Sequence, residues 1–403
     1  ETSDGTIGAA IWDWVDQAIY DPQEMKNGVY RLHTGYDYPG PHQGNFCSNG
    51  IIPATREASP KLAEVKAAHQ FVKFRLLGTD PATGAMRVSV RNAYAFRSLA
   101  DMDLSYQILS DGNPVSGGSV AIPDVAPGDS TVMTLTVAPK VFSEAASAGA
   151  ELLLNVNACE RYATTYAPAG HSVAHAQYQL AEPAPLPQIK PEGKALAVSN
   201  KNGVTTVSGK NINAAFDNTT GQITRLDIDG ISMIADGLGF IYDNHRWIEN
   251  DRFTNTSNGL DSIGSVKVTK KGGIVTVSTQ RGGSLCATTI DYIFYPQGVV
   301  DIKATFDPKT DKLRRAGLVC AINPSLDYVD YYANGPMENY VDRKDGALVG
   351  RYATTVDKMP VQYVKPQSTG GREGLRELKL TDAAGRGIMI QTEGRVSFSI
   401  LPF

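Results

Sequence analysis

The sequence predicts a mainly β protein that begins with a single strand, loop and helix. From about residue 71 to the end, short runs of alternating apolar and polar residues lie between turn-forming residues, as in half-buried strands. Helical periodicity is almost absent after residue 192. Residues 1–70 differ, because they contain an apolar run without alternation, a long loop and one helical pattern.

The first 70 residues are predicted to form one βα unit. Residues 7–14 (IGAAIWDW) lack polar alternation, which is typical of a strand covered on both faces. The segment 21–52 is rich in Gly, Pro, Tyr, His and Asn, and a loop of this length usually has a functional reason. Ser59 and Pro60 supply an N-cap and a first helical position. Apolar residues then recur at helical spacing: Leu62, Val65, Ala68 and Val72.

Residues 71–182 are predicted to form an immunoglobulin-like β-sandwich. Turn-forming groups at 111–114 and 127–129 separate short strands at the spacing expected of such a module. Cys159 is the only cysteine in this range, which excludes the inter-sheet disulfide of antibody domains. The predicted strands are 87–96, 103–109, 130–137, 151–158 and 174–181.

A Pro-rich segment at 183–191 is predicted to be an extended linker. It leads into a second and larger β domain over 192–403, where alternation resumes and continues to the last residues. The predicted strands there are 195–200, 205–210, 223–229, 265–271, 274–279, 288–295, 299–306, 318–324 and 388–394.

Composition excludes several classes of function. The 403 residues carry 38 Lys and Arg against 42 Asp and Glu, a net charge of −4, and no basic stripe is visible, so nucleic acid is not an expected partner. No apolar run approaches the roughly 18 residues of a membrane span, so a membrane is not expected either. The cysteines fit neither a CxxC metal site nor a dense disulfide framework, and they leave the compartment open: Cys47, Cys159, Cys286 and Cys320.

Three blocks of sequence, in order, carry a family resemblance: residues 10–17 (AIWDWVDQ), 44–50 (GNFCSNG) and 56–66 (REASPKLAEVK). Together they resemble the last strand, loop and helix of the catalytic barrel in the large bacterial β-galactosidases of glycoside hydrolase family 2. Downstream motifs agree with the later domains of the same family: 90–96 (VRNAYAF), 216–223 (FDNTTGQI), 335–340 (GPMENY), 371–377 (GREGLRE) and 380–385 (LTDAAG).

The resemblance implies a fold for the whole chain. Residues 1–70 would be the terminal βα unit of a (β/α)8 barrel, and 71–182 the family's immunoglobulin-like domain. Residues 192–403 would be a large, galactose mutarotase-like β super-sandwich that is cut short. All 403 residues would then correspond to the C-terminal part of such an enzyme.

The resemblance also implies that no catalytic residue lies in this chain. Retaining glycosidases use two carboxyl groups about 5–5.5 Å apart. In the family both are glutamates on earlier barrel strands, and no acidic residue here matches either motif. The chain alone is therefore expected to hydrolyse nothing, although the parent enzyme would be a β-galactosidase-like glycosidase.

Trp12 is the first candidate for substrate binding. By resemblance it forms the apolar floor under the galactosyl ring, where an indole can cover the C–H face of a pyranose. Without the resemblance, a core tryptophan packed under the sandwich is the simpler interpretation. Trp14 is expected to be structural, and Asp13 and Asp16 to accept backbone N–H bonds within the loop.

Phe46 and Asn49 are the candidate metal ligands. By resemblance, the Phe46 carbonyl and the Asn49 side-chain oxygen bind an active-site sodium ion that in turn binds a sugar hydroxyl, which makes Asn49 a substrate-binding residue as well. The alternative is a turn in which Asn49 and Gly50 simply satisfy the backbone. Because the family's carboxylate ligand has no match here, sodium affinity of the chain is expected to be weak. Magnesium is a further candidate in the parent enzyme, with ligands outside this chain.

Other polar residues are expected to have structural or solvent-exposed roles rather than catalytic ones. His33 and His42 are expected to be solvated loop residues, since their spacing is no metal signature. The segment 242–247 (YDNHRW) matches a family loop that approaches the active site, but only Asp243 and Asn244 are retained, which leaves its role open. An internal network that braces the second β domain is expected from Glu338, Asn339 and Arg343.

Two other functions remain open from the sequence. One is a stand-alone carbohydrate-binding β-sandwich, against which the apolar strand at 7–14 argues, because it would expose both faces. The other is a β-glucuronidase or β-mannosidase relative, and the sodium-type loop favours galactose over these. The compartment stays open, as does homo-oligomerisation of the parent enzyme.

Overall fold

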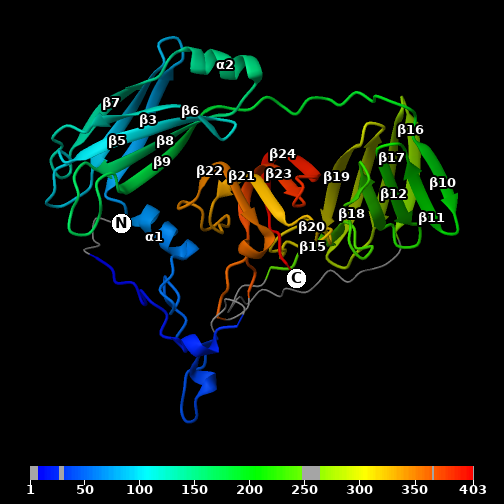
Figure 1. Ribbon diagram of the computed structural model, residues 1–403, viewed down its shortest axis with the longest axis horizontal. Coiled ribbons are helices and arrows are strands. Elements are labelled where there is room, and N and C mark those ends of the chain that lie inside the picture. The colour runs from blue at the N-terminus through cyan, green and yellow to red at the C-terminus, as the bar shows by residue number, and fades with distance from the viewer. Residues whose placement is uncertain (1–7, 27–30, 247–263, 365–366, 403) are drawn as a thin grey trace.

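The computed structural model describes residues 8–26, 31–246, 264–364 and 367–402. Seven sheets and few helices account for its regular structure, so the predicted mainly β fold class is confirmed. In Figure 1 the β-sandwich that follows α1 lies at one end and the sheets of β10–β14 and β16–β19 at the other, with β21–β24 between them. None of the described helices is long and apolar enough to span a membrane.

The predicted strand at 7–14 is wrong for the residues that the structure describes. Residues 8–18 contain no strand, and their ladder contact is one parallel bridge between Val15 and Ile52. A strand is stabilised by hydrogen bonds to neighbouring strands, and within the described residues none runs beside 8–14. The next elements are short: β1 Ile19–Tyr20, β2 Leu32–His33, and the 3-10 turns Pro22–Glu24 and Gly35–Asp37.

The predicted helix is present as α1, Pro60–His69. Ser59 caps it by accepting the Leu62 N–H, and Pro60 occupies the first turn, as the sequence predicts. Val72 does not continue the helix, contrary to the predicted spacing. It opens β3 and is fully buried in the sandwich core, so packing in the sheet overrides the periodicity.

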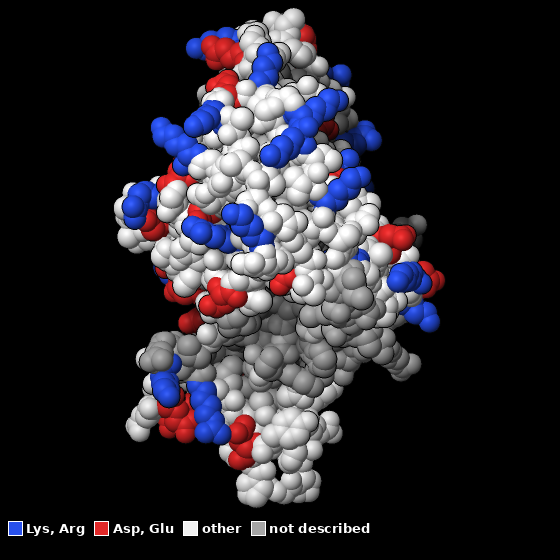
Figure 2. Space-filling view, turned by 90° about the vertical axis from the view of Figure 1, so that its right-hand side faces the viewer, with Lys and Arg blue, Asp and Glu red and all other residues white. Residues whose placement is uncertain are grey.

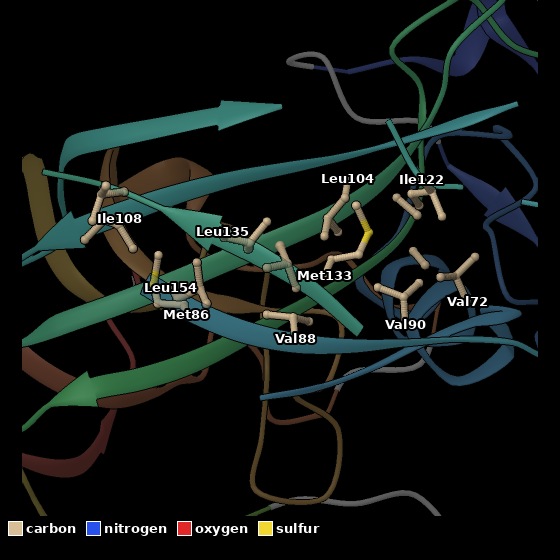
Figure 3. Close-up of a cluster of buried hydrophobic side chains, with 14 of the residues drawn as sticks. Val72, Met86, Val88, Val90, Leu104, Ile108, Ile122, Met133, Leu135 and Leu154 are labelled. Atoms are coloured by element: carbon tan, nitrogen blue, oxygen red, sulfur yellow. The ribbon is translucent and has the colours of Figure 1, made fainter. Parts of the chain in front are cut away.

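Residues 72–181 form a β-sandwich of two sheets and seven strands, of which β3 and β6 are not among the five predicted strands. One sheet has the order β3-β4-β7 and the other β6-β5-β8-β9, with every pairing antiparallel. Alternate side chains from both sheets meet in one apolar core (Figure 3). The elements are β3 Val72–Asp80, β4 Ala85–Asn92, β5 Met102–Ser110, β6 Asn113–Ala121, β7 Ser130–Thr136, α2 Lys140–Ala148, β8 Leu152–Glu160 and β9 Ser172–Ala181.

The predicted strand at 87–96 ends early, at Asn92, for a visible reason. The buried Asn92 side chain donates to the carbonyls of Arg97 at 2.7 Å and Val125 at 2.9 Å, and accepts from the Tyr94 N–H at 2.9 Å. These bonds turn the chain out of the sheet.

Residues 183–191, the predicted linker, contain neither helix nor strand and cross from the sandwich to the most distant sheets (Figure 1). Those sheets have the orders β10-β11-β12-β13-β14 and β16-β17-β18-β19. Their strands are β10 Ala197–Lys201, β11 Val204–Ser208, β12 Ile212–Asp217, β13 Ile223–Ile228, β14 Ile231–Ser232, β16 Ser265–Lys271, β17 Ile274–Arg281, β18 Cys286–Tyr295 and β19 Val299–Pro308.

The chain then returns toward the sandwich in a third large sheet, β22-β21-β23-β24. One continuous apolar core joins this sheet to the two preceding ones. Its elements are β21 Tyr328–Gly335, β22 Leu348–Thr355, the 3-10 turn Val356–Lys358, β23 Arg372–Thr381 and β24 Gly387–Phe398, and a small pair is formed by β15 Ile241–Asp243 and β20 Gly317–Val319. On the face shown in Figure 2, basic and acidic side chains are interspersed.

Candidate functional site

Two segments that are 30 residues or more apart in the sequence are joined by backbone hydrogen bonds. The N–H of Ile51 donates to the Asp13 carbonyl at 3.0 Å, and the N–H of Ile52 to the Trp14 carbonyl at 3.0 Å. Asp13 donates its own N–H to the carbonyl of Asn49 at 3.4 Å. The structure therefore brings Trp12, which directly precedes Asp13, next to the turn that contains Phe46 and Asn49.

The Trp12 side chain does not belong to a core within the described chain. Trp12 is 75% exposed, so the alternative of a core tryptophan under the sandwich does not hold for these residues. Trp14, expected to be structural, is 51% exposed and lines an apolar groove of about 370 Å³ with Ile11, Leu62 and Phe71. An exposed indole beside a polar turn is a surface on which the apolar face of a small molecule can lie.

The turn brings the two candidate ligand residues together. The Asn49 Nδ2 donates to the Phe46 carbonyl at 2.6 Å, and both residues are exposed. A carbonyl and an amide oxygen are neutral, hard donors of the kind that sodium accepts. In this arrangement the amide nitrogen faces the carbonyl, so joint binding of a cation by both oxygens would require the amide to rotate and this hydrogen bond to be replaced.

Two oxygens supply only part of a coordination shell. Among the described residues there is no group of three or more His, Cys, Asp or Glu side chains placed to hold a metal ion. A monovalent cation at these two oxygens would therefore need further ligands.

Gly50, directly after Asn49, is held from several sides. Its N–H donates to Asp16 Oδ1 at 2.6 Å, which confirms that Asp16 accepts a backbone N–H, and its carbonyl accepts from the Lys61 ammonium. The Ser59 hydroxyl donates to the next carbonyl, that of Ile51. Asp13 accepts instead from the Gln17 side chain, which corrects the expectation of a backbone partner.

Asp16 and Lys61 are partly buried and of opposite charge. Burial raises the pKa of Asp16, while the Gly50 N–H and the nearby Lys61 oppose this shift. Burial lowers the pKa of Lys61, opposed by Asp16 and reinforced by Arg343. Each group thus offsets part of the other's desolvation cost.

His33 and His42 stabilise the loop in which they lie. His33 pairs through Nε2 with Glu24, and its Nδ1 lies 3.8 Å from Asp37. His42 Nδ1 accepts the Gly44 N–H at 3.0 Å. His42 is exposed, as expected of a solvated loop residue, whereas the His33 side chain is only 17% exposed, which corrects that expectation for His33.

In the segment 242–247, Arg246 lies beside the loop that follows β21. Asp243 forms an ion pair with Arg315, and Arg246 lies 3.6 Å from Asp342 and over the Tyr340 ring at 4.7 Å. Trp247 lies outside the described residues.

The predicted internal network around Glu338 is confirmed. The buried Glu338 carboxylate accepts from Arg343 Nη2 at 2.6 Å, from the Gly370 N–H at 2.6 Å and from the Tyr363 hydroxyl. Asn339 donates to the carbonyls of Asn334 and Met337 at 3.1 and 2.9 Å. These contacts brace the end of β21.

Sequence reasoning missed two contacts that hold the site in place. Lys61 carried no signal beyond its place in the first turn of α1. Glu64 Oε2 accepts the Gly346 N–H at 2.9 Å, and this contact attaches α1 to the third large sheet. Neither partner can be inferred from local spacing, because each lies in a segment distant in the sequence.

Comparison with known families gives three matches in order along the chain. Residues 3–74 match the model described as glycosyl hydrolases family 2, TIM barrel domain. Residues 88–181 match β-galactosidase, domain 4, and residues 208–403 match β-galactosidase small chain. The first match fits the prediction that residues 1–70 are part of a TIM barrel, although the described residues 8–18 form no strand. The boundaries 70/71, 182/183 and 191/192 stay predictions.

Curated relatives match nearly all of the chain. A β-galactosidase of Priestia megaterium (strain DSM 319 / IMG 1521) is 29% identical over 98% of this chain and 39% of its own length. β-Galactosidase 2 of Enterobacter cloacae is 27% identical over 97% of this chain and 39% of its own length, and a β-galactosidase of Streptococcus thermophilus 27% over 94% and 37%. The chain thus spans about two fifths of the length of these relatives. Three successive family matches and relatives aligned over nearly every residue show that the chain is similar, over nearly its whole length, to β-galactosidases of glycoside hydrolase family 2.

Proposed function

We propose that this chain forms the C-terminal part of a retaining glycoside hydrolase, the parent enzyme, that cleaves terminal β-galactosides. The relatives are named β-galactosidases, and the family is a glycoside hydrolase family. The single observation that carries the proposal within the structure is the pairing of an exposed Trp12 with the 46–49 turn through the bond between Asp13 and Asn49.

Each site residue has a defined part in this proposal. The Trp12 indole covers the C–H face of the galactosyl ring and excludes water from it. The Phe46 carbonyl and the Asn49 amide oxygen would hold sodium, which supplies a positive charge for a sugar hydroxyl to approach. The turn that carries these oxygens also fixes where that hydroxyl lies relative to Trp12.

The acid/base and nucleophilic carboxyls come from outside this chain in the proposal. Retaining hydrolysis needs two carboxyl groups about 5–5.5 Å apart. Asp13 and Asp16, the carboxylates next to Trp12, are engaged with Gln17 and with Gly50. The chain alone is therefore expected to be inactive.

Turnover of chromogenic substrates tests the proposal. The parent enzyme is expected to hydrolyse a nitrophenyl β-galactoside at least about a hundredfold more efficiently than the β-glucuronide or β-mannoside, and the 403-residue chain none of them. Preference for a glucuronide or mannoside would replace galactose as the substrate. Hydrolysis by the chain alone would show that catalytic carboxyls are present in it. Binding of oligosaccharides by the chain without any hydrolysis by a longer protein would favour a carbohydrate-binding module.

A further inference from the structure

Gly50, near the proposed site, is hydrogen-bonded by side chains at both its N–H and its carbonyl. A Cβ at Gly50 would lie 2.1 Å from the Asp16 nitrogen and 2.5 Å from the Val15 carbonyl carbon, so the two segments approach closely enough that only glycine fits. Its N–H and its carbonyl are both taken by charged side chains, Asp16 and Lys61. Both polar groups of one residue are thus fixed by an oppositely charged pair.

Partly burying Asp16 and Lys61 destabilises the fold unless the hydrogen bonds of the two charged groups offset the loss of hydration. Partial burial of a carboxylate and an ammonium costs desolvation free energy, and hydrogen bonds to charged groups are stronger than those between neutral groups. The hydrogen bonds that Asp16 and Lys61 form with Gly50 do not cap a helix. They are directed at the residue that follows Asn49.

We propose that Asp16 and Lys61 are positioning residues that clamp Gly50 and thereby fix the 46–49 turn beside Trp12. The link to substrate binding rests on the proposed function, whereas the clamp itself rests only on the contacts of Asp16, Lys61 and Gly50. Lys61 acts from the first turn of α1, and Glu64 attaches α1 to the third large sheet through the Gly346 N–H. The β domain that follows the linker is therefore connected to the turn through α1.

Amide hydrogen exchange of the 403-residue chain, without sodium or sugar, tests the clamp directly. In Asp16→Ala and in Lys61→Met, we expect exchange at Gly50, Ile51 and Ile52 to accelerate at least about tenfold, because a hydrogen bond to a charged group is lost. Asp16→Asn keeps an acceptor oxygen and Lys61→Arg keeps a donor, so both should exchange more slowly than the truncated variants. They also serve if a truncated variant does not fold.

Matched controls are available in the same region. Glu57 and Lys66 are exposed, and Glu57→Gln and Lys66→Met should leave exchange at 50–52 within about twofold of wild type. The clamp is overturned if Asp16→Ala and Lys61→Met also stay within twofold, or if exchange accelerates equally throughout α1 and β3, which would indicate general destabilisation.

A second readout separates the clamp from the proposed function. In the parent enzyme, Lys61→Met is expected to raise KM and the sodium concentration for half activation severalfold, with a smaller effect on kcat, and Lys61→Arg to restore much of both. If exchange accelerates as expected but neither Lys61→Met nor Asn49→Ala changes KM or the sodium response, the proposed function of the turn fails and the clamp stands. If exchange is unchanged, the clamp fails whatever Asn49→Ala does.

Discussion

The guanidinium of Arg376 in β23 donates two hydrogen bonds to the carboxylate of Glu151, which directly precedes β8, from Nε at 3.0 Å and from Nη2 at 2.8 Å. The Glu151 side chain is 1% exposed, and it also accepts from the Tyr332 hydroxyl. The two residues are 225 positions apart and join the immunoglobulin-like sandwich to the third large sheet. Reciprocal bonds between Gln177 and the Val349 backbone, at 2.8 and 2.9 Å, reinforce the same contact.

Removal of the Glu151 carboxylate should therefore be strongly destabilising. Glu151→Ala leaves the Arg376 charge without its partner, and breaking a buried pair in this way costs about 3–5 kcal/mol. Urea denaturation followed by tryptophan fluorescence measures this loss in the free energy of unfolding. The exposed Glu144→Ala in α2 is the control and should change stability by less than about 0.5 kcal/mol. Equal midpoints for the two variants would show that the contact contributes little.

Acid should weaken the sandwich through Glu160. Its side chain is 1% exposed, and hydrogen bonds from Arg97 lower the pKa of this carboxyl below its ordinary value of 4.5. A lowered folded-state pKa means that the stabilisation is present above pH 4.5 and is lost as the pH falls through the folded pKa. We expect Glu160→Gln to destabilise at pH 7 and to flatten the loss of stability below pH 4.5. Parallel stability–pH curves for variant and wild type would contradict this.

Thiol reactivity should differ among the four cysteines, none of which forms a disulfide in the structure. Burial raises the pKa of Cys320 to about 11, so about a thousandth of it is thiolate at pH 8. Cys286 is buried, whereas Cys320 and Cys47 are both partly exposed. Alkylation followed by mass spectrometry should label Cys47 faster than Cys320, and Cys286 only after denaturation. Labelling of Cys320 at the rate of Cys47 would contradict the burial.

The sodium response of the parent enzyme should depend on Asn49. Asn49→Ala removes one of the two proposed ligand oxygens and the hydrogen bond to the Phe46 carbonyl. We expect activity that no longer changes with sodium at constant ionic strength, while the neighbouring Ser48→Ala keeps the wild-type response. An unchanged response in Asn49→Ala would end the ligand assignment.

Local chemistry made much of the fold predictable. Alternation predicted most strands of the sandwich, and Ser59 and Pro60 predicted where α1 begins. The prediction of strands failed where tertiary contacts, rather than the local sequence, determine whether a segment forms a strand. Residues 8–14 are apolar enough for a strand but have no neighbouring strand among the described residues, and β6, which contains two glycines and a proline, carries no strand pattern.

The candidate site residues could be predicted from the sequence, but the side chains that hold them in place could not. Trp12, Phe46 and Asn49 were found through motifs that resemble a family, and the structure brings them together. Lys61 and Arg376 act on backbone or carboxylate groups far away in the sequence, so neither periodicity nor spacing could reveal their partners.

The most direct test of the proposed site is the kcat/KM of Trp12→Ala in the parent enzyme with a nitrophenyl β-galactoside. We expect a fall of about a hundredfold or more, corresponding to about 2.7 kcal/mol of transition-state binding, while Trp12→Phe retains much of the activity and Trp14→Phe stays near wild type. An unchanged kcat/KM in Trp12→Ala would contradict the assignment of this exposed indole to the sugar and would limit its role to packing.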